Sequence, residues 1–178
     1  MTEVVIFREF LLSLLQVIDN KIVKGIIKTP GKLQLPSIQD GWRFNFQKHA
    51  KSKGAKIYIL VAEETPNQIE GCLVYKMKDD QEPYMAYIEI APHNRTKNKL
   101  YERIAGCLIA FACRLSFIMG KDYFKGWLAF DVQEEKIEDQ KKLMSIYSKN
   151  YRARKYNETT MLIIPEDGES LIEEFLES

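Results

Sequence analysis

The sequence predicts an α/β protein, of the mixed α+β kind, in which helices flank one mixed central sheet. Two patterns support this prediction. Three strand-like segments follow one another closely, as in an antiparallel meander. A long apolar helix then stands between two strand-like segments, which is typical of a parallel crossover. The 178 residues suit one domain with a substantial core, so we expect residues 1–178 to form a single domain.

The predicted meander occupies residues 56–62, 69–77 and 85–91. The first segment is apolar and β-branched throughout, as a central strand should be. The turn signals Thr65-Pro66-Asn67 and Lys78-Asp79-Asp80-Gln81 separate the three strands. Turns this short join neighbouring antiparallel strands.

The predicted crossover consists of a helix at residues 101–119 and a buried strand at residues 124–130. Apolar residues recur along the helix at the spacing of one helical face. A charged helix at 134–150, a strand at 159–164 and a C-terminal helix within 165–178 complete the predicted order.

The N-terminal third of the chain predicts helices. Residues 3–19 carry apolar side chains at helical spacing, which favours an amphipathic helix. Residues 21–36 predict a short extended piece and a loop, and residues 40–52 predict a second helix. We therefore expect N-terminal helices and a variable region in 1–55, and the core in 56–164.

Composition and charge exclude several classes of protein. The 26 basic and 25 acidic residues are mixed along the chain, with a net charge of +1. A nucleic-acid groove needs a concentrated excess of Lys and Arg, so we expect no nucleic-acid partner. No pair of Cys or His residues has the spacing of zinc ligands, so we expect no metal site.

The cysteines and the apolar runs predict a cytoplasmic protein. Cys72, Cys107 and Cys113 are odd in number and each lies in an apolar run, as buried, reduced thiols do. The run 4–12 contains charges and lacks the pattern of a signal peptide. The run 104–120 is interrupted by a charged residue and is too short to span a bilayer, so we expect no membrane partner.

The order of elements resembles the GNAT superfamily, the acetyl-CoA-dependent N-acetyltransferases, over residues 56–164. The first supporting motif is Tyr87-Ile88-Glu89-Ile90-Ala91-Pro92, which leads into a loop and a helix. The resemblance implies that the exposed backbone of Ile88 and Ile90 binds the pantetheine arm of the co-substrate acetyl-CoA. It also implies that the N-terminus of the following helix binds the diphosphate, as free N–H groups and the helix dipole favour.

The second motif is the diphosphate loop, which in the family is Arg/Gln-x-x-Gly-x-Gly/Ala. One register is Leu100-Tyr101-Glu102-Arg103-Ile104-Ala105, in which the final small residue matches and the other two key positions do not. The other is Arg95-Thr96-Lys97-Asn98-Lys99-Leu100, in which Asn98 takes the place of a glycine. The side chains at these positions imply weaker binding or a different contact with phosphate. The resemblance assigns co-substrate contacts to Lys99, Tyr101, Arg103, Ile104, Ala105 and Gly106.

The third motif is Tyr147-Ser148-Lys149-Asn150-Tyr151, which resembles the family's Tyr-x-x-x-Gly-Phe block with Asn150 where glycine is expected. Tyr147 then corresponds to the general acid that protonates the departing thiolate. Gln140 corresponds to an Asn that contacts pantetheine in the family. A tyrosine on an apolar helix face is otherwise most often a core residue.

The general base has two candidates. Glu89 is an acid in an apolar strand, where the alternative is an outward-facing side chain in ordinary alternation. Asp131 follows the next strand.

The resemblance implies transfer of an acetyl group from acetyl-CoA to a primary amine by direct attack, and the sequence does not name this acceptor. One alternative is a catalytically inactive GNAT-like protein that senses CoA or binds a protein. A second is an unrelated α+β interaction protein, such as a homodimer.

Overall fold

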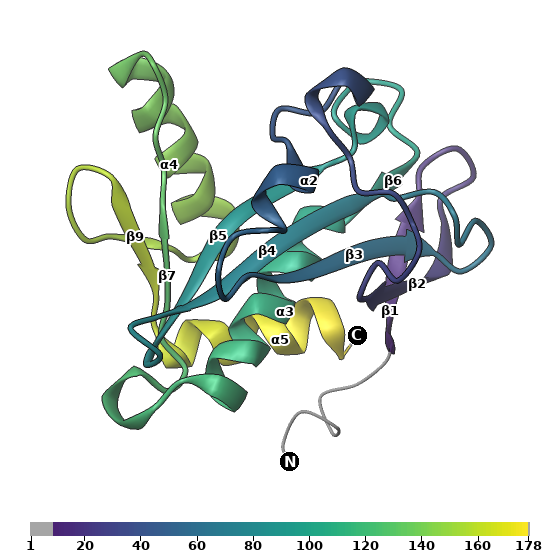
Figure 1. The fold of residues 1–178 in the computed structure, drawn as a ribbon. Helices are drawn as coiled ribbons and strands as arrows, with labels where there is room; N and C mark the ends of the chain where they lie inside the picture. The colour runs from purple at the N-terminus through teal and green to yellow at the C-terminus, as the bar shows by residue number, and fades with distance from the viewer. Residues whose placement is uncertain (1–8, 178) are drawn as a thin grey trace.

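One sheet organises the molecule, and helices lie on both of its faces (Figure 1). The computed structural model describes residues 9–177. The strands in this range are β1 (Glu9–Gln16), β2 (Lys21–Lys28), β3 (Lys56–Ala62), β4 (Gly71–Lys78), β5 (Glu82–Ile90), β6 (Tyr101–Glu102), β7 (Leu128–Asp131), β8 (Arg154–Lys155) and β9 (Thr160–Ile163). The α-helices are α2 (Phe46–His49), α3 (Ile104–Met119), α4 (Ile137–Tyr151) and α5 (Pro165–Leu176).

The described strands stand in the order β6-β1-β2-β3-β4-β5-β7-β9-β8. The predicted meander is confirmed, because β3 pairs antiparallel with β4, and β4 pairs antiparallel with β5. The parallel crossover is confirmed as well, since α3 connects β5 to its parallel neighbour β7. The sheet is therefore mixed, and the class is α/β in one domain, as the sequence predicts.

The predicted N-terminal helix at residues 3–19 is wrong within the described residues. Residues 9–16 form β1, which pairs antiparallel with β2. Leu12 and Leu14 are buried, whereas Leu11 is exposed and Ser13 is less buried, so burial follows the two-residue period of a strand. The remainder of that prediction, residues 3–8, lies outside the described residues.

The second predicted helix, at 40–52, is reduced to the single turn of α2. Asn45 begins this turn by accepting a hydrogen bond at its side chain from the Lys48 N–H, at 3.2 Å. Phe46 is fully buried against the sheet. Most of residues 40–52 is therefore non-helical and covers one face of the sheet, on which its aromatic side chains pack.

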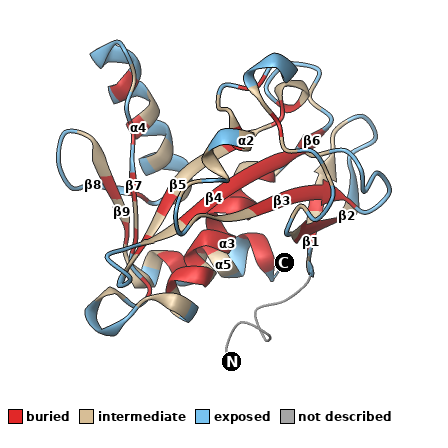
Figure 2. Cartoon of the chain, viewed as in Figure 1, coloured by how far each residue is buried: buried red, intermediate tan, exposed pale blue. Residues whose placement is uncertain are grey.

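Two apolar layers lie on opposite faces of the sheet, and the buried residues follow them (Figure 2). The larger layer lies between the sheet and α3 and α5, where Phe111 and Leu108 are fully inaccessible. The smaller layer lies under the segment that contains α2, around Trp42 and Phe46. The three cysteines are buried and free, as predicted. Among the described residues, no helix has the length and apolar character needed to cross a membrane.

Candidate functional site

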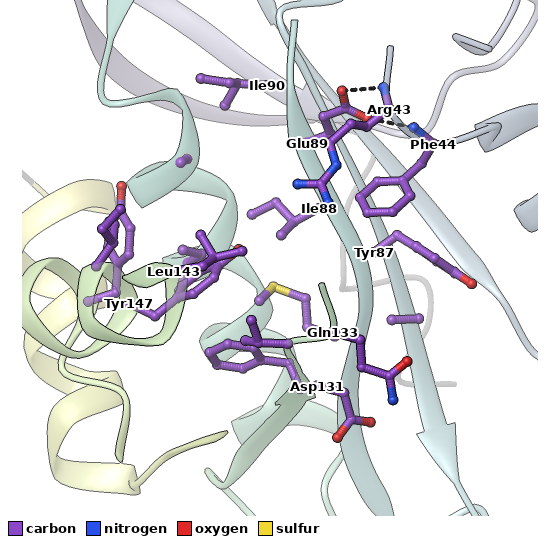
Figure 3. Close-up of a pocket in the computed structure, with 18 of the residues that line it drawn as sticks. Arg43, Phe44, Tyr87, Ile88, Glu89, Ile90, Asp131, Gln133, Leu143 and Tyr147 are labelled. Atoms are coloured by element: carbon purple, nitrogen blue, oxygen red, sulfur yellow. Dashed lines mark hydrogen bonds between the residues drawn. The ribbon is translucent and has the colours of Figure 1, made fainter. Parts of the chain in front are cut away.

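A cavity of about 320 Å³ opens where β5 and β7 diverge. These parallel strands pair at one position, Tyr84 with Ala129, and then separate. The residues around the opening come from the segment before α2, from β5, from α3, from the end of β7 and from α4. Figure 3 labels ten of them: Arg43, Phe44, Tyr87, Ile88, Glu89, Ile90, Asp131, Gln133, Leu143 and Tyr147.

A β-bulge in β5 shapes the wall of this cavity. Tyr75 pairs with Met85 and Val74 with Tyr87, so that Ala86 is an extra residue in β5. Met85 therefore points to the α3 side of the sheet, and both Ala86 and Tyr87 point to the α2 side. A bulge bends a strand and increases its twist, which favours the separation from β7.

The backbone of β5 is exposed to the gap at the positions predicted to hold pantetheine. The Ala91 N–H donates to the Glu70 carbonyl, which precedes β4, at 2.8 Å. Alternate residues of a strand direct their N–H and C=O groups to opposite sides. The backbone groups of Ile88 and Ile90 therefore point away from β4, toward the gap where β7 has separated. Both side chains pack on the α3 side, and both residues line the cavity.

The start of α3 lies beside the cavity. Ala105 lines the cavity, and the N–H groups of Ile104, Ala105 and Gly106 precede the first intrahelical hydrogen bond, which the Cys107 N–H donates to the Arg103 carbonyl at 2.9 Å. Free N–H groups at a helix start favour an anion. Gly106 itself is buried against α5, where a Cβ atom would lie 2.2 Å from the ring of Phe175.

Arg103 occupies the left-handed N-cap position of α3, with φ of 82°. Its side chain is directed to α5 and β1: Nη2 donates to the Glu174 carbonyl at 2.9 Å, and Nε to the Ser13 carbonyl at 3.3 Å. The guanidinium also lies over the ring of Phe175. The side chain of this predicted phosphate ligand therefore binds protein groups in this structure.

The other two predicted ligands before α3 lie in the loop and in β6. Lys99 pairs with Glu102, with Nζ and Oε1 3.2 Å apart. Tyr101 is buried, and its N–H donates to Oδ1 of Asn94. Neither residue lines the cavity between β5 and β7.

Tyr147 lines the cavity from α4, on the opposite side from Ile88 (Figure 3). Its ring packs on Phe130 with 5.0 Å between the ring centroids. Burial, together with the neighbouring Tyr151, raises the pKa of Tyr147 to about 12. The phenol is therefore protonated at neutral pH and has a proton to donate.

Glu89 lies on the polar side of the cavity and is buried, so it is not the outward-facing residue of the alternative interpretation. Its carboxylate accepts hydrogen bonds from the N–H groups of Arg43 and Phe44. Nη2 of Arg95 lies 3.0 Å from Oε2. The carboxylate thus holds the segment before α2 against β5.

Asp131, the second candidate base, also lines the cavity. Its two oxygens accept hydrogen bonds from the hydroxyls of Tyr84 and Thr160, both at 2.6 Å. Partial burial opposes ionisation, but these hydrogen bonds and the nearby Lys78 outweigh it and lower the pKa of Asp131. Asp131 is accordingly a carboxylate at neutral pH.

The structure does not bring Gln140 to the cavity. Its Oε1 accepts from the Glu134 N–H at 3.2 Å, and its Nε2 donates to the Glu158 carbonyl at 2.8 Å. The third motif also expects a glycine-like conformation at position 150, and the structure does not have it there. Asn150 is helical, and the left-handed residue that ends α4 is Arg152, with φ of 59°.

The sequence gives no sign that Arg43 and Glu134 belong to the site. Arg43 belongs to an aromatic segment that predicts core packing, and Glu134 begins a charged run that predicts a solvated helix face. Their side chains meet at the cavity, with Nη2 and Oε2 2.7 Å apart, although 91 positions separate them in the chain. The pairing of β5 with β7 and the hydrogen bonds of Glu89 to the segment before α2 bring them together, so no local signal could identify the pair.

Comparisons with protein-family models, with curated proteins and with solved structures found no match to this chain. The described residues contain no group of three or more His, Cys, Asp or Glu side chains placed to hold a metal ion.

Proposed function

We propose that this protein is a GNAT-type N-acetyltransferase that transfers an acetyl group from acetyl-CoA to a primary amine. The observation that carries the proposal is the cavity between the diverging parallel strands β5 and β7, with Tyr147 on its α4 side. The resemblance of residues 56–164 to that superfamily supplies the identity of the co-substrate.

The two sides of the cavity suit the two substrates differently. The side toward α3 and α4 is apolar, with Ile88, Ile109 and Leu143. This apolar side ends at the free N–H groups that begin α3. It therefore suits the pantetheine arm of acetyl-CoA, with the anionic diphosphate at the start of the helix. The side toward α2 is polar, with Arg43, Glu89 and Asp131, and fits an amine acceptor.

The proposed chemistry uses groups on both sides. The acceptor nitrogen forms a bond to the thioester carbonyl carbon, and the carbon–sulfur bond breaks. Tyr147, which is protonated at neutral pH, donates its proton to the departing thiolate. Glu89, through a water molecule or directly, takes the proton that the amine loses, and Asp131 is the alternative acceptor of that proton.

Calorimetry with acetyl-CoA and CoA, followed by turnover with amine acceptors, tests the proposal. We expect Tyr147→Phe to bind acetyl-CoA as the wild type does and to lose activity by about 100-fold or more. The matched control is Tyr123→Phe, because Tyr123 is 92% exposed and lies outside the cavity. Binding without loss of activity in Tyr147→Phe would remove Tyr147 from the mechanism.

A non-catalytic role is the second candidate, and Arg103 favours it. The first register of the diphosphate motif expects glycine at position 103, and a left-handed φ of 82° is a conformation that glycine adopts most easily. A side chain there narrows the approach of a phosphate to the backbone. Acetyl-CoA binding without turnover would favour a CoA sensor, and absence of binding at millimolar ligand would favour a protein-interaction module.

A further inference from the structure

Asp131 lines the polar side of the cavity, and the ring of Tyr84 lies beside its carboxylate, outside the cavity lining. Tyr84 donates its hydroxyl proton to Asp131, which fixes the carboxylate beside the aromatic ring. The ammonium of Lys78 lies 3.8 Å from the ring centroid and 4.0 Å from Oδ2 of Asp131. An alkylammonium in this chain thus already lies against a carboxylate and an aromatic ring, the two groups that best attract such a cation.

The other two carboxylates on this polar side are held more tightly. Glu134 is 2.7 Å from Nη2 of Arg43. Glu89 accepts two backbone hydrogen bonds and pairs with Arg95 at 3.0 Å. Asp131, by contrast, is paired with Lys78 at 4.0 Å, which is beyond hydrogen-bond distance, and the Lys78 side chain is 50% exposed. Since exposed pairs of this kind contribute little, a ligand can displace Lys78.

We propose that Asp131 and Tyr84 bind one ammonium group of the acceptor, in the position that Lys78 occupies, and that the acceptor is therefore an alkyl diamine. This inference rests on the proposed acetyl transfer with Glu89, and not Asp131, as the base. A carboxylate favours the charged form of a neighbouring amine, and a charged ammonium has no lone pair for attack. The amine at Asp131 is consequently an anchor, and the attacking amine is a second group of the same molecule.

The apolar part of the cavity favours the neutral, unprotonated form of that second amine. Ile88, Phe130 and Tyr147 line the gap between β5 and β7. Burial among apolar groups favours the neutral form of an amine, which is the nucleophilic form. The same cavity thus offers a charged anchor site at its rim and a site for a neutral nucleophile inside.

Cadaverine and pentylamine test the inference, because they share a five-carbon chain and differ in the second amine. We expect the wild type to prefer cadaverine by about tenfold or more in kcat/KM, which corresponds to about 1.4 kcal/mol. Lys78→Met removes the internal competitor and should lower the KM for cadaverine several-fold. The control Lys53→Met, at an exposed lysine that neither lines the cavity nor pairs with Asp131, should leave that KM unchanged.

Direct titration of each amine without acetyl-CoA separates this inference from the proposed function. Tighter binding of cadaverine by Lys78→Met than by the wild type, and loss of binding in Asp131→Asn, would support the anchor site even if acetyl transfer were absent. Thermal unfolding of Asp131→Asn checks that the variant is folded. Equal binding of cadaverine and pentylamine, equal and measurable turnover of the two, or no cadaverine binding by Lys78→Met, would overturn the inference. Failure to bind acetyl-CoA would instead count against the proposed function.

Discussion

The carboxylate of Glu89 in β5 accepts a hydrogen bond of 2.7 Å from the backbone N–H of Arg43, 46 positions earlier in the chain. Its other oxygen accepts from the N–H of Phe44 at 3.0 Å. Two backbone donors outside any helix or strand are thereby satisfied by one buried acid. The contact explains why a charged residue stands in an apolar strand, and it places Arg43 at the cavity.

We predict that Glu89→Gln lowers the free energy of unfolding by about 1–3 kcal/mol, measured by urea denaturation. The neutral amide has one acceptor oxygen, so one of the two backbone N–H groups loses its partner, and the pair with Arg95 loses its charge. The matched control is Glu158→Gln, at a side chain that is 82% exposed, which should change stability by less than about 0.5 kcal/mol.

The same variant distinguishes two roles of Glu89. In either role Glu89→Gln loses the stability predicted above. A general base would in addition lose kcat by about 100-fold or more. A residue that only positions the Arg43 segment would change KM and leave kcat nearly unchanged. Unchanged stability together with unchanged activity would contradict both roles.

The central part of the fold is predictable because its signals are local. The strand at 56–62 has the bounds of β3, since a continuous β-branched run ends at turn residues. The helix at 101–119 begins three residues later than predicted, because Tyr101 and Glu102 pair with β1 instead. Such pairing depends on a distant strand, so the helical spacing of 101–103 could not reveal it.

The N-terminal hairpin and the rim of the cavity are not predictable in this way. Residues 9–16 satisfy helical and strand spacing about equally, and the pairing with β2 decides between them. Similarly, Tyr147 carries a recognisable motif, whereas the Arg43–Glu134 pair depends on two elements that only the folded sheet brings together. The resemblance thus names Tyr147, which lines the cavity, and also Gln140 on the same helix, which does not, while partners across elements have no local signal.

Gly106→Ala should destabilise the protein by about 1–3 kcal/mol, as overpacking of a core does. The added methyl group would lie 2.2 Å from Cε1 of Phe175, in the contact between α3 and α5. Chemical denaturation of the variant measures the loss. The additional substitution Phe175→Leu should recover part of it, and a full loss in the double variant would place the cause elsewhere.

A second glycine in the same helix pair should respond in the opposite direction. Gly168 lies in α5, where a Cβ atom would meet Cβ of Cys113 at 3.5 Å, an ordinary contact. Because alanine favours a helix over glycine by about 1 kcal/mol, Gly168→Ala should raise the free energy of unfolding by up to that amount. A destabilised Gly168→Ala would show that α3 and α5 pack more closely than these distances indicate.

At alkaline pH, Tyr147 should make folding stability fall as the pH rises above about 10. Its pKa is raised to about 12 by burial, so the unfolded chain loses this proton first, near pH 10. Below that pH both states keep the proton and the residue has no effect on the pH dependence. Tyr147→Phe should therefore show a smaller loss of stability between pH 9 and 11 than the wild type or Tyr123→Phe. Equal slopes for all three proteins would exclude this contribution.

At acidic pH, His49 should make stability fall, because its environment disfavours the charged ring. Burial lowers the pKa of His49, and the cations of Lys48 and Lys76 lower it further. As the pH falls below about 6.5, the unfolded chain takes up this proton before the folded one, so stability is lost in that range. His49→Phe keeps a ring on Tyr87, where the two rings of the wild type stack with 3.8 Å between their centroids, and it removes the titrating group.

The urea midpoints of unfolding at pH 7.5 and 5.5 should therefore differ less in His49→Phe than in the wild type, and Lys76→Met should give an intermediate difference. If His49→Phe lost as much stability on acidification as the wild type, the acid sensitivity would have to come from other groups.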